Sequence, residues 1–237
     1  AYFPRPPTFR PLPEIDLFLQ IDASKEDEWI RLKDLCKYGW QSWPDYNISL
    51  SLKVSYPILE SFEELYYLSP LLTQLILAGC DNVPERIGDL TSLKKLSLAY
   101  WCDKLRSLPE RIGDLEALQT LNLVQCSSLV SLPERIGDLE ALQTLNLRQC
   151  SGLVSLPDSI GNLTSLTEVD LSYCYQLKSL PDSIRQLESL TELDLSDCYA
   201  LRSLPAIVAL KKLSLRKCGV LDMNAEIDKI VEMKNLT

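Results

Sequence analysis

The sequence predicts an α/β fold: a curved, horseshoe-shaped solenoid with a parallel sheet on its concave face and short helical or 3-10 turns on its convex face. Two observations predict it. Residues 108–123 and 132–147 are the same sixteen letters, LPERIGDLEALQTLNL, and the match extends on both sides with a period of 24 residues. Each period also holds two apolar patterns, and neither can bury its apolar face unless the periods stack on one another.

One period contains a strand pattern followed by a turn pattern. Leu121 and Leu123 alternate with polar or variable residues, which is typical of a half-buried strand. The segment LPERIGDLEAL begins with a proline and places Ile112, Leu115 and Leu118 three residues apart, which favours a short helical or 3-10 turn with one apolar face. We therefore expect stacked strands on one side, stacked turns on the other and leucines between them.

About seven units can be aligned, and they predict a seven-stranded sheet over residues 71–221. Four units are regular, and three weaker copies flank them with small insertions or deletions. The regular units are 116–139, 140–163, 164–187 and 188–210, and the weaker ones are 71–90, 91–115 and 210–223.

The two ends of the chain are expected to cover the ends of the repeats. Residues 1–70 are assigned to a proline-rich arm and a capping region, with a strand over the alternating stretch NISLSLKVSY. Residues 222–237 are assigned to a closing helix capped by Asn224. Within the capping region, helices are expected at 23–37 and 57–68.

Composition excludes several classes of function. A net charge of −9 disfavours binding to a phosphate backbone, so nucleic acid is not an expected partner. The chain has no histidine, clustered nucleophile and base, phosphate loop or metal-ligand set, so neither an enzyme nor a bound cofactor or metal is expected. No run of 18 apolar residues occurs, so no membrane-spanning helix is expected.

The consensus LxxLxLxxCxxLxxLPxxIxxL resembles the leucine-rich-repeat family over about residues 71–221. It is most similar to the intracellular plant repeats in the C-terminal part of nucleotide-binding disease-resistance receptors. The resemblance implies a horseshoe and a role in recognising a ligand. It does not imply the nucleotide-binding module, because the sequence has no GxxxxGK[ST] loop. The chain is either a fragment of such a receptor or another protein built from similar repeats.

Seven of the eight cysteines fall at the same place after the strand, and Cys102 among them is displaced by one residue. In the resembled family this position is a buried turn, where a thiol can act as a small apolar group and weak donor. Zinc binding, disulfides and redox sensing are the alternatives, and none fits a straight buried ladder. Regularly spaced free thiols favour an intracellular, cytoplasmic location; an organelle reached with a cleaved targeting peptide is the alternative.

The residues that vary between repeats are expected to form a binding surface on the concave face. Glu168 and Asp170 should lie beside Glu192 and Asp194, and adjacent like charges destabilise a sheet. This acidic band is predicted to receive a basic segment of a protein partner; unselected drift of a solvated surface is the alternative. The predicted contact residues are Lys95, Tyr100, Asn122, Asn146, Arg148, Glu168, Asp170, Tyr173, Glu192, Asp194, Asp197, Lys212 and Arg216.

Three functions compete on these observations. The first is a non-catalytic recognition module that binds a protein through its concave face. The second is a structural subunit of a large assembly, in which the arm and the convex surface matter equally. The third is a ubiquitin-ligase adaptor, because LPEI at 12–15 and RLKDLCKYGWQSW at 31–43 faintly resemble an F-box.

Overall fold

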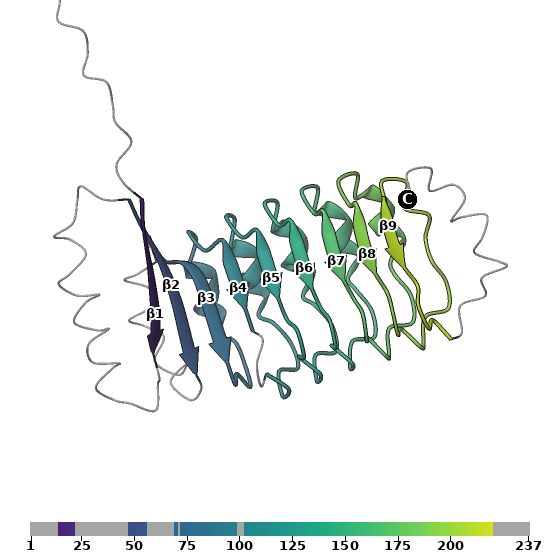
Figure 1. Cartoon of the computed structure of the whole chain (residues 1–237), viewed down its shortest axis with the longest axis horizontal. Helices are drawn as coiled ribbons and strands as arrows, with labels where there is room; N and C mark the ends of the chain where they lie inside the picture. The colour runs from purple at the N-terminus through teal and green to yellow at the C-terminus, as the bar shows by residue number, and fades with distance from the viewer. Residues whose placement is uncertain (1–13, 22–46, 56–68, 71, 99–101, 220–237) are drawn as a thin grey trace, which may run out of the picture.

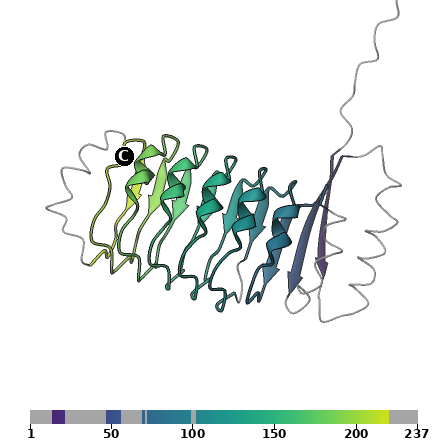
Figure 2. The ribbon, with the colours of Figure 1, turned by 180° about the vertical axis from the view of Figure 1, so that it is seen from behind.

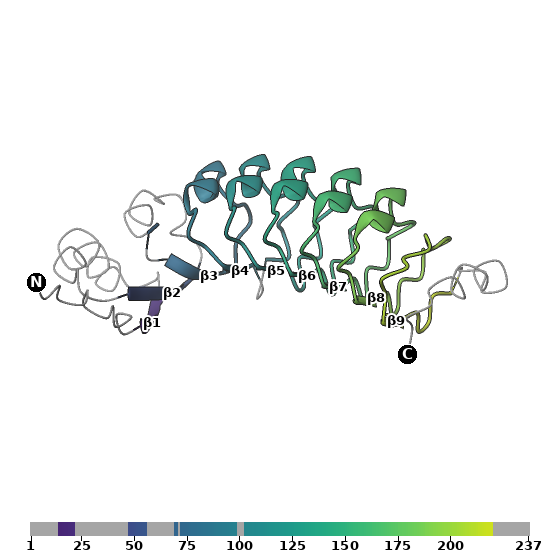
Figure 3. The same cartoon turned by 90° about the horizontal axis from the view of Figure 1, so that it is seen from above.

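The computed structural model describes residues 14–21, 47–55, 69–70, 72–98 and 102–219. Within these residues, nine parallel strands pair in chain order to form a single sheet (Figure 1). Figure 3 shows this sheet along the inner side of an arch, with the 3-10 turns on the outer side. The predicted α/β solenoid, concave sheet and convex turns are confirmed. The strands are β1 (Glu14–Ile21), β2 (Asn47–Ser55), β3 (Leu72–Ala78), β4 (Lys95–Ser97), β5 (Thr120–Asn122), β6 (Thr144–Asn146), β7 (Glu168–Asp170), β8 (Glu192–Asp194) and β9 (Lys212–Ser214).

The seven strands expected over residues 71–221 are present as β3–β9, and the sheet continues beyond them through β1 and β2. The strand expected in NISLSLKVSY is present as β2, whereas no strand was expected at β1. Leu17 and Leu19 in β1 pair with Leu50 and Leu52 in β2, so the apolar alternation continues in register. Two residues of the F-box-like motif, Glu14 and Ile15, lie in β1. The arm at 1–13, the expected helices at 23–37, 57–68 and 224–236, and the remainder of that motif lie outside the described residues.

The convex face consists of short 3-10 helices (Figure 2). Each follows a proline with φ between −70° and −66°, and each is closed by bonds between residues three apart, as from Ile112 N–H to the Pro109 carbonyl at 3.1 Å. The expected turns in these segments are therefore confirmed. They are η4 (Glu85–Asp89), η5 (Glu110–Asp114), η6 (Glu134–Asp138), η7 (Asp158–Asn162) and η8 (Asp182–Gln186).

A glycine in four of these turns permits close stacking. A Cβ atom added at Gly113 would lie 2.4 Å from the Arg135 carbonyl oxygen of the next turn, which is closer than atoms can approach. Arg185 occupies the equivalent position in η8, and no 3-10 helix follows in the unit 188–210. The glycine is thus replaced at the one of these five turns on which no further turn stacks.

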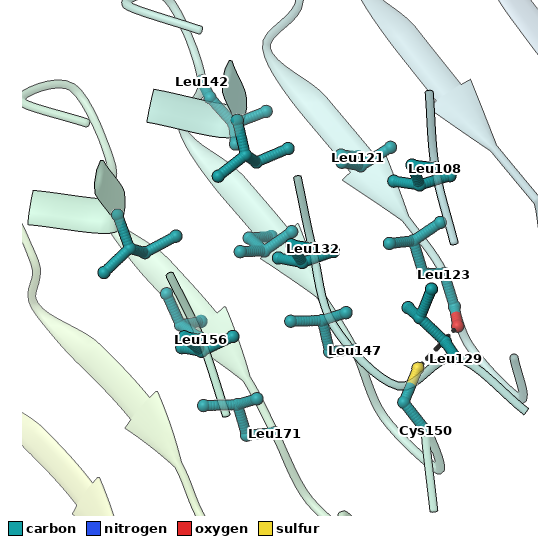
Figure 4. Packing of buried hydrophobic residues seen from close by; sticks show 14 of the residues in the cluster. Leu108, Leu121, Leu123, Leu129, Leu132, Leu142, Leu147, Cys150, Leu156 and Leu171 are labelled. Carbon is teal, nitrogen blue, oxygen red and sulfur yellow. Dashed lines mark hydrogen bonds between the residues drawn. The ribbon is translucent and has the colours of Figure 1, made fainter. Parts of the chain in front are cut away.

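The leucines form one continuous core between sheet and turns (Figure 4). Leu121 and Leu145 are fully buried, and Leu193 is 1% exposed. Neighbouring strands pair these positions directly, as in Leu121 with Leu145 and Leu193 with Leu213. The register predicted from the 24-residue period is therefore correct over β3–β9.

The cysteines form a ladder of thiol hydrogen bonds inside this core. The Sγ atom of Cys150 donates to the Leu123 carbonyl of the preceding repeat at 3.1 Å (Figure 4), and Cys174 and Cys198 make the equivalent bond at 3.2 Å. All seven described cysteines are free, and burial raises the pKa of Cys126 and of Cys198 to about 12. The prediction that these thiols fill a buried turn and satisfy its backbone is confirmed.

Candidate protein-interaction surface

Four carboxylates lie side by side on the concave face of the sheet, on strands β7 and β8. Glu168 pairs with Glu192 and Asp170 pairs with Asp194 in the parallel register. We call these four residues the acidic band. Together with Lys212 and Ser214 of β9 they line a shallow hollow of about 150 Å³. The structure thus brings together the acidic residues that the period aligned.

The two aspartates of the acidic band have a role in the fold. The Oδ1 atom of Asp170 accepts a 2.8 Å hydrogen bond from the Ser172 N–H, and Asp194 accepts one of the same length from Ser196. Asn122 and Asn146 accept the equivalent bonds at 3.1 and 3.0 Å. The fold therefore requires a short side chain with an acceptor oxygen at this position of the repeat. This structural role was not predicted from the sequence. It does not explain the negative charge, because an asparagine amide makes the same bond.

The two glutamates of the band differ in their surroundings. The Oε2 atom of Glu192 lies 3.0 Å from the Nζ atom of Lys212 on β9, and this hydrogen bond raises the pKa of the lysine. Glu168 is exposed and, within the described residues, has no cationic partner within salt-bridge distance. Lys212 on the last strand therefore forms an ion pair with Glu192, whereas Glu168 on β7 has none among the described residues.

Aromatic side chains lie beside the acidic band, in the loops that follow β7 and β8. The Arg148 guanidinium sits 4.6 Å from the centre of the Tyr173 ring, and its Nη1 donates to the Ser172 hydroxyl at 3.1 Å. Tyr173 meets Tyr175 edge-on at 6.3 Å, and Tyr175 stacks on Tyr199 at 5.3 Å. We call the last three residues the tyrosine row.

Tyr173 and Arg148 were among the predicted contact residues, whereas Tyr175 and Tyr199, which are 42% and 47% exposed, were not. Each of the two follows a repeat cysteine directly, at the position of Ser127 and Ser151 in the two earlier repeats. An aromatic residue at the same exposed position of two adjoining repeats was the available signal. Tyrosine and arginine are enriched in the energetically dominant parts of protein interfaces.

Asp197 does not lie open to a partner, contrary to expectation. The residue is only 3% exposed, and its Oδ1 accepts a 2.8 Å bond from the Tyr199 hydroxyl. That bond, followed by the nearby Lys217 ammonium at 3.4 Å, lowers the pKa of its carboxyl group. The Tyr199 hydroxyl and the Lys217 ammonium therefore cover this carboxylate. Asp197 therefore supports the tyrosine row from within.

The remaining predicted contact residues are dispersed over the sheet. Lys95 is exposed on β4, three strands from the acidic band, and Arg216 is exposed just after β9. Asn122 and Asn146 are half-buried on β5 and β6. Tyr100 lies outside the described residues. The structure thus gathers the acidic band, Arg148, Tyr173 and Lys212 into one region and leaves Lys95 apart from it.

A larger hollow of about 950 Å³ lies beside the convex turns, but its two arginines pair with its three aspartates. Arg111 contacts Asp89 at 2.7 Å and Asp114 at 2.9 Å, and Arg135 contacts Asp114 at 2.8 Å and Asp138 at 2.9 Å. This arginine–aspartate ladder joins η4, η5 and η6. Its groups have partners within the fold, so it is a weaker candidate for recognition than the acidic band.

The described residues lack two features that other functions would need. No helix there is long and apolar enough to cross a membrane. No group of three or more histidine, cysteine, aspartate or glutamate residues in the same part of the chain is arranged to hold a metal ion.

Comparison with known proteins supports the repeat assignment. Residues 71–176 match a family model described as a leucine-rich repeat region. The leucine-rich repeat domain of the type III effector XopL is 29% identical, with a TM-score of 0.64 over 86% of this chain and 69% of that one. A leucine-rich repeat protein of Leptospira interrogans is also 29% identical, with a TM-score of 0.51 over 80% of this chain; the chain spans 53% of that protein. No curated protein matched the sequence.

Leucine-rich-repeat domains are typically protein–protein interaction modules and are generally non-catalytic. The resemblance to plant disease-resistance repeats stays a prediction. The stacked 24-residue units, the buried leucine core and these matches together show a leucine-rich-repeat solenoid and support a leucine-rich-repeat family for this chain.

Proposed function

We propose that this chain is a non-catalytic recognition module that binds a protein partner through its concave face, where the acidic band contacts a basic segment of that partner. The supporting observation is that Asp170 and Asp194 carry charges that their structural hydrogen bonds do not require. Like charges on adjacent strands destabilise a sheet, so a partner that neutralises them recovers that free energy on binding.

The surroundings of the band support the same proposal. Glu168 has no ion pair among the described residues, and its negative potential would attract a basic segment. The tyrosine row and Arg148 supply large, partly exposed rings beside the charges, and such rings commonly dominate interface energetics. Charge would then direct association, and aromatic packing would hold the complex.

We also propose an intracellular location. The seven described cysteines are free, and six of them are buried in a regular ladder. Free thiols persist in reducing compartments, whereas oxidising compartments favour disulfides.

The partner is to be isolated by affinity purification on the whole chain at physiological salt and then titrated against variants. Asp170→Asn with Asp194→Asn removes two charges while keeping both hydrogen bonds to the backbone. We expect the Kd of the purified partner to weaken about tenfold, with a shallower dependence on salt concentration. Asp158→Asn with Asp182→Asn is the matched control, because it removes two charges from the convex turns. Equal binding by all three proteins at every salt concentration would reject the concave site.

A further inference from the structure

A column of left-handed residues follows the strands of the sheet, and two of its side chains, Gln125 and Gln149, are not explained by folding. Gln125, Gln149, Tyr173, Asp197 and Lys217 all have φ between 59° and 67°, a region that is unfavourable for residues with a Cβ atom. They occupy equivalent positions in successive repeats, and Gly79 occupies the same position with φ 72°. Glycine therefore fits this position, yet five repeats hold a side chain there.

The backbone hydrogen bonds at Gln125, Gln149 and Tyr173 do not depend on the side chains of these residues. The Gln125, Gln149 and Tyr173 N–H groups donate to carbonyl oxygens of the next repeat at 2.9, 2.8 and 2.8 Å, and glycine would make the same bonds. Within the described part of the chain, the side-chain amides of Gln125 and Gln149 make no hydrogen bond. Strained residues that contribute nothing to the fold are candidates for contact with a ligand.

The side chains of Gln125, Gln149 and Tyr173 line a hollow of about 400 Å³ that also borders Tyr175 of the tyrosine row. Its walls are mostly neutral: two glutamine amides, the hydroxyl groups of Ser127 and Ser151, and the rings of Tyr173 and Tyr175, with Asp103 at its rim. Glutamine amides both donate to and accept from a peptide backbone, and tyrosine rings pack against proline or aromatic rings. We call this the rim hollow. Tyr173 of the rim hollow and Asp170 of the acidic band belong to the same repeat, three residues apart.

One segment of this chain has the matching chemistry. Residues 1–13, AYFPRPPTFRPLP, contain five prolines, three aromatic residues, Arg5 and Arg10, and no acidic residue. Proline-rich sequences favour the extended polyproline conformation, which is recognised by grooves lined with aromatic side chains at little entropic penalty. The two arginines complement the carboxylates of the acidic band.

We propose that residues 1–13 of a second copy of the chain bind across the rim hollow and the acidic band, with proline or aromatic rings against the tyrosine row and the arginines on the carboxylates. This inference rests on the proposed function and names one partner for the same surface. It assigns the strained glutamines to contacts with the backbone of the bound segment.

Sedimentation velocity of the whole chain over a range of concentrations tests the proposal, together with titration of a labelled synthetic peptide of residues 1–13. We expect concentration-dependent association that excess peptide reverses. Gln125→Gly with Gln149→Gly should weaken peptide binding about tenfold while the melting temperature stays the same or rises, because glycine relieves the left-handed strain. Arg5→Gln with Arg10→Gln should weaken association without changing the melting temperature.

Asp158→Asn with Asp182→Asn again serves as the control and should leave self-association unchanged. A chain that stays monomeric at all concentrations, or a peptide that does not bind, would overturn the inference, as would glycine variants that bind normally. Failure of this kind is distinct from failure of the proposed function: a purified partner that still requires Asp170 and Asp194 would leave recognition by the acidic band intact.

Discussion

The repeats of β5 and β6 and those of β7 and β8 share one backbone and one core but differ in their surface. Both pairs keep the buried leucines, the thiol ladder and the side-chain oxygen that accepts from the residue two positions on. The first pair presents threonine, asparagine and serine where the second presents glutamate, aspartate and tyrosine. The fold therefore depends on the residues that recur in every repeat, and the residues that differ between repeats are available for recognition.

The largest expected effect comes from disrupting the leucine core that the two regions share. Leu145→Asp puts an unpaired charge into the continuous core, and we expect the free energy of unfolding to fall by at least about 4 kcal/mol. Val130→Asp is the matched control, because Val130 is 51% exposed and its replacement should change stability little. Chemical denaturation followed by circular dichroism measures both. A near-parental curve for Leu145→Asp would contradict the core register.

A smaller effect concerns the stacking of the convex turns. Gly113→Ala forces a methyl group against the Arg135 carbonyl, and we expect a loss of about 1–3 kcal/mol. Arg185→Gly at the equivalent position of η8 should cost less than about 1 kcal/mol, because no further 3-10 turn stacks on it. Thermal melts of the two variants compare them directly; equal losses would show that stacking does not select the glycine.

Removing the charge from one region should stabilise the fold modestly, and introducing it into the other should destabilise the fold by a similar amount. Asp170→Asn with Asp194→Asn should raise the free energy of unfolding by about 0.2–1 kcal/mol, because it removes adjacent like charges. Asn122→Asp with Asn146→Asp should lower it by a similar amount. Urea denaturation at low salt measures both changes. Destabilisation by the first pair would show that the charges serve the fold.

The smallest expected effect is on the pH dependence of stability, which the early turns contribute to and the later turns do not. Hydrogen bonds from Arg135 and Arg111 lower the pKa of Asp114, so this carboxylate stabilises the fold above its unfolded pKa of about 3.9 and loses that contribution as pH falls through the lower folded value. The later turns η7 and η8 lack this ladder within the described contacts. The free energy of unfolding should therefore fall less steeply with decreasing pH in Arg135→Gln than in the parent chain. An unchanged pH dependence in the acid range would argue against the ladder.

The sequence was sufficient to predict those features of the fold that recur with the 24-residue period. The core positions Leu121, Leu145 and Leu193, the strand register and the proline-led turns all follow from letters that recur every 24 residues. The strand β1 lacks those letters, so its alternation of Ile15, Leu17 and Leu19 was passed over although it is the usual strand pattern.

The candidate surface was less predictable, because it depends on geometry that no period encodes. Aligning equivalent positions of the repeats does not show which side chains are covered by their neighbours. Asp197 is buried because the Tyr199 hydroxyl, two residues further on, covers its carboxylate. The structural hydrogen bonds of Asp170 and Asp194 were missed for a similar reason, since they depend on the turn that follows each strand.

The comparison is tested most directly by making β6 resemble β7. Thr144→Glu with Asn146→Asp extends the acidic band by one strand and keeps the hydrogen bond from the Arg148 N–H. The measurement is the Kd of the purified partner for this variant beside the parent chain, at low and physiological salt. The account predicts tighter binding with a steeper salt dependence; unchanged or weaker binding would contradict it.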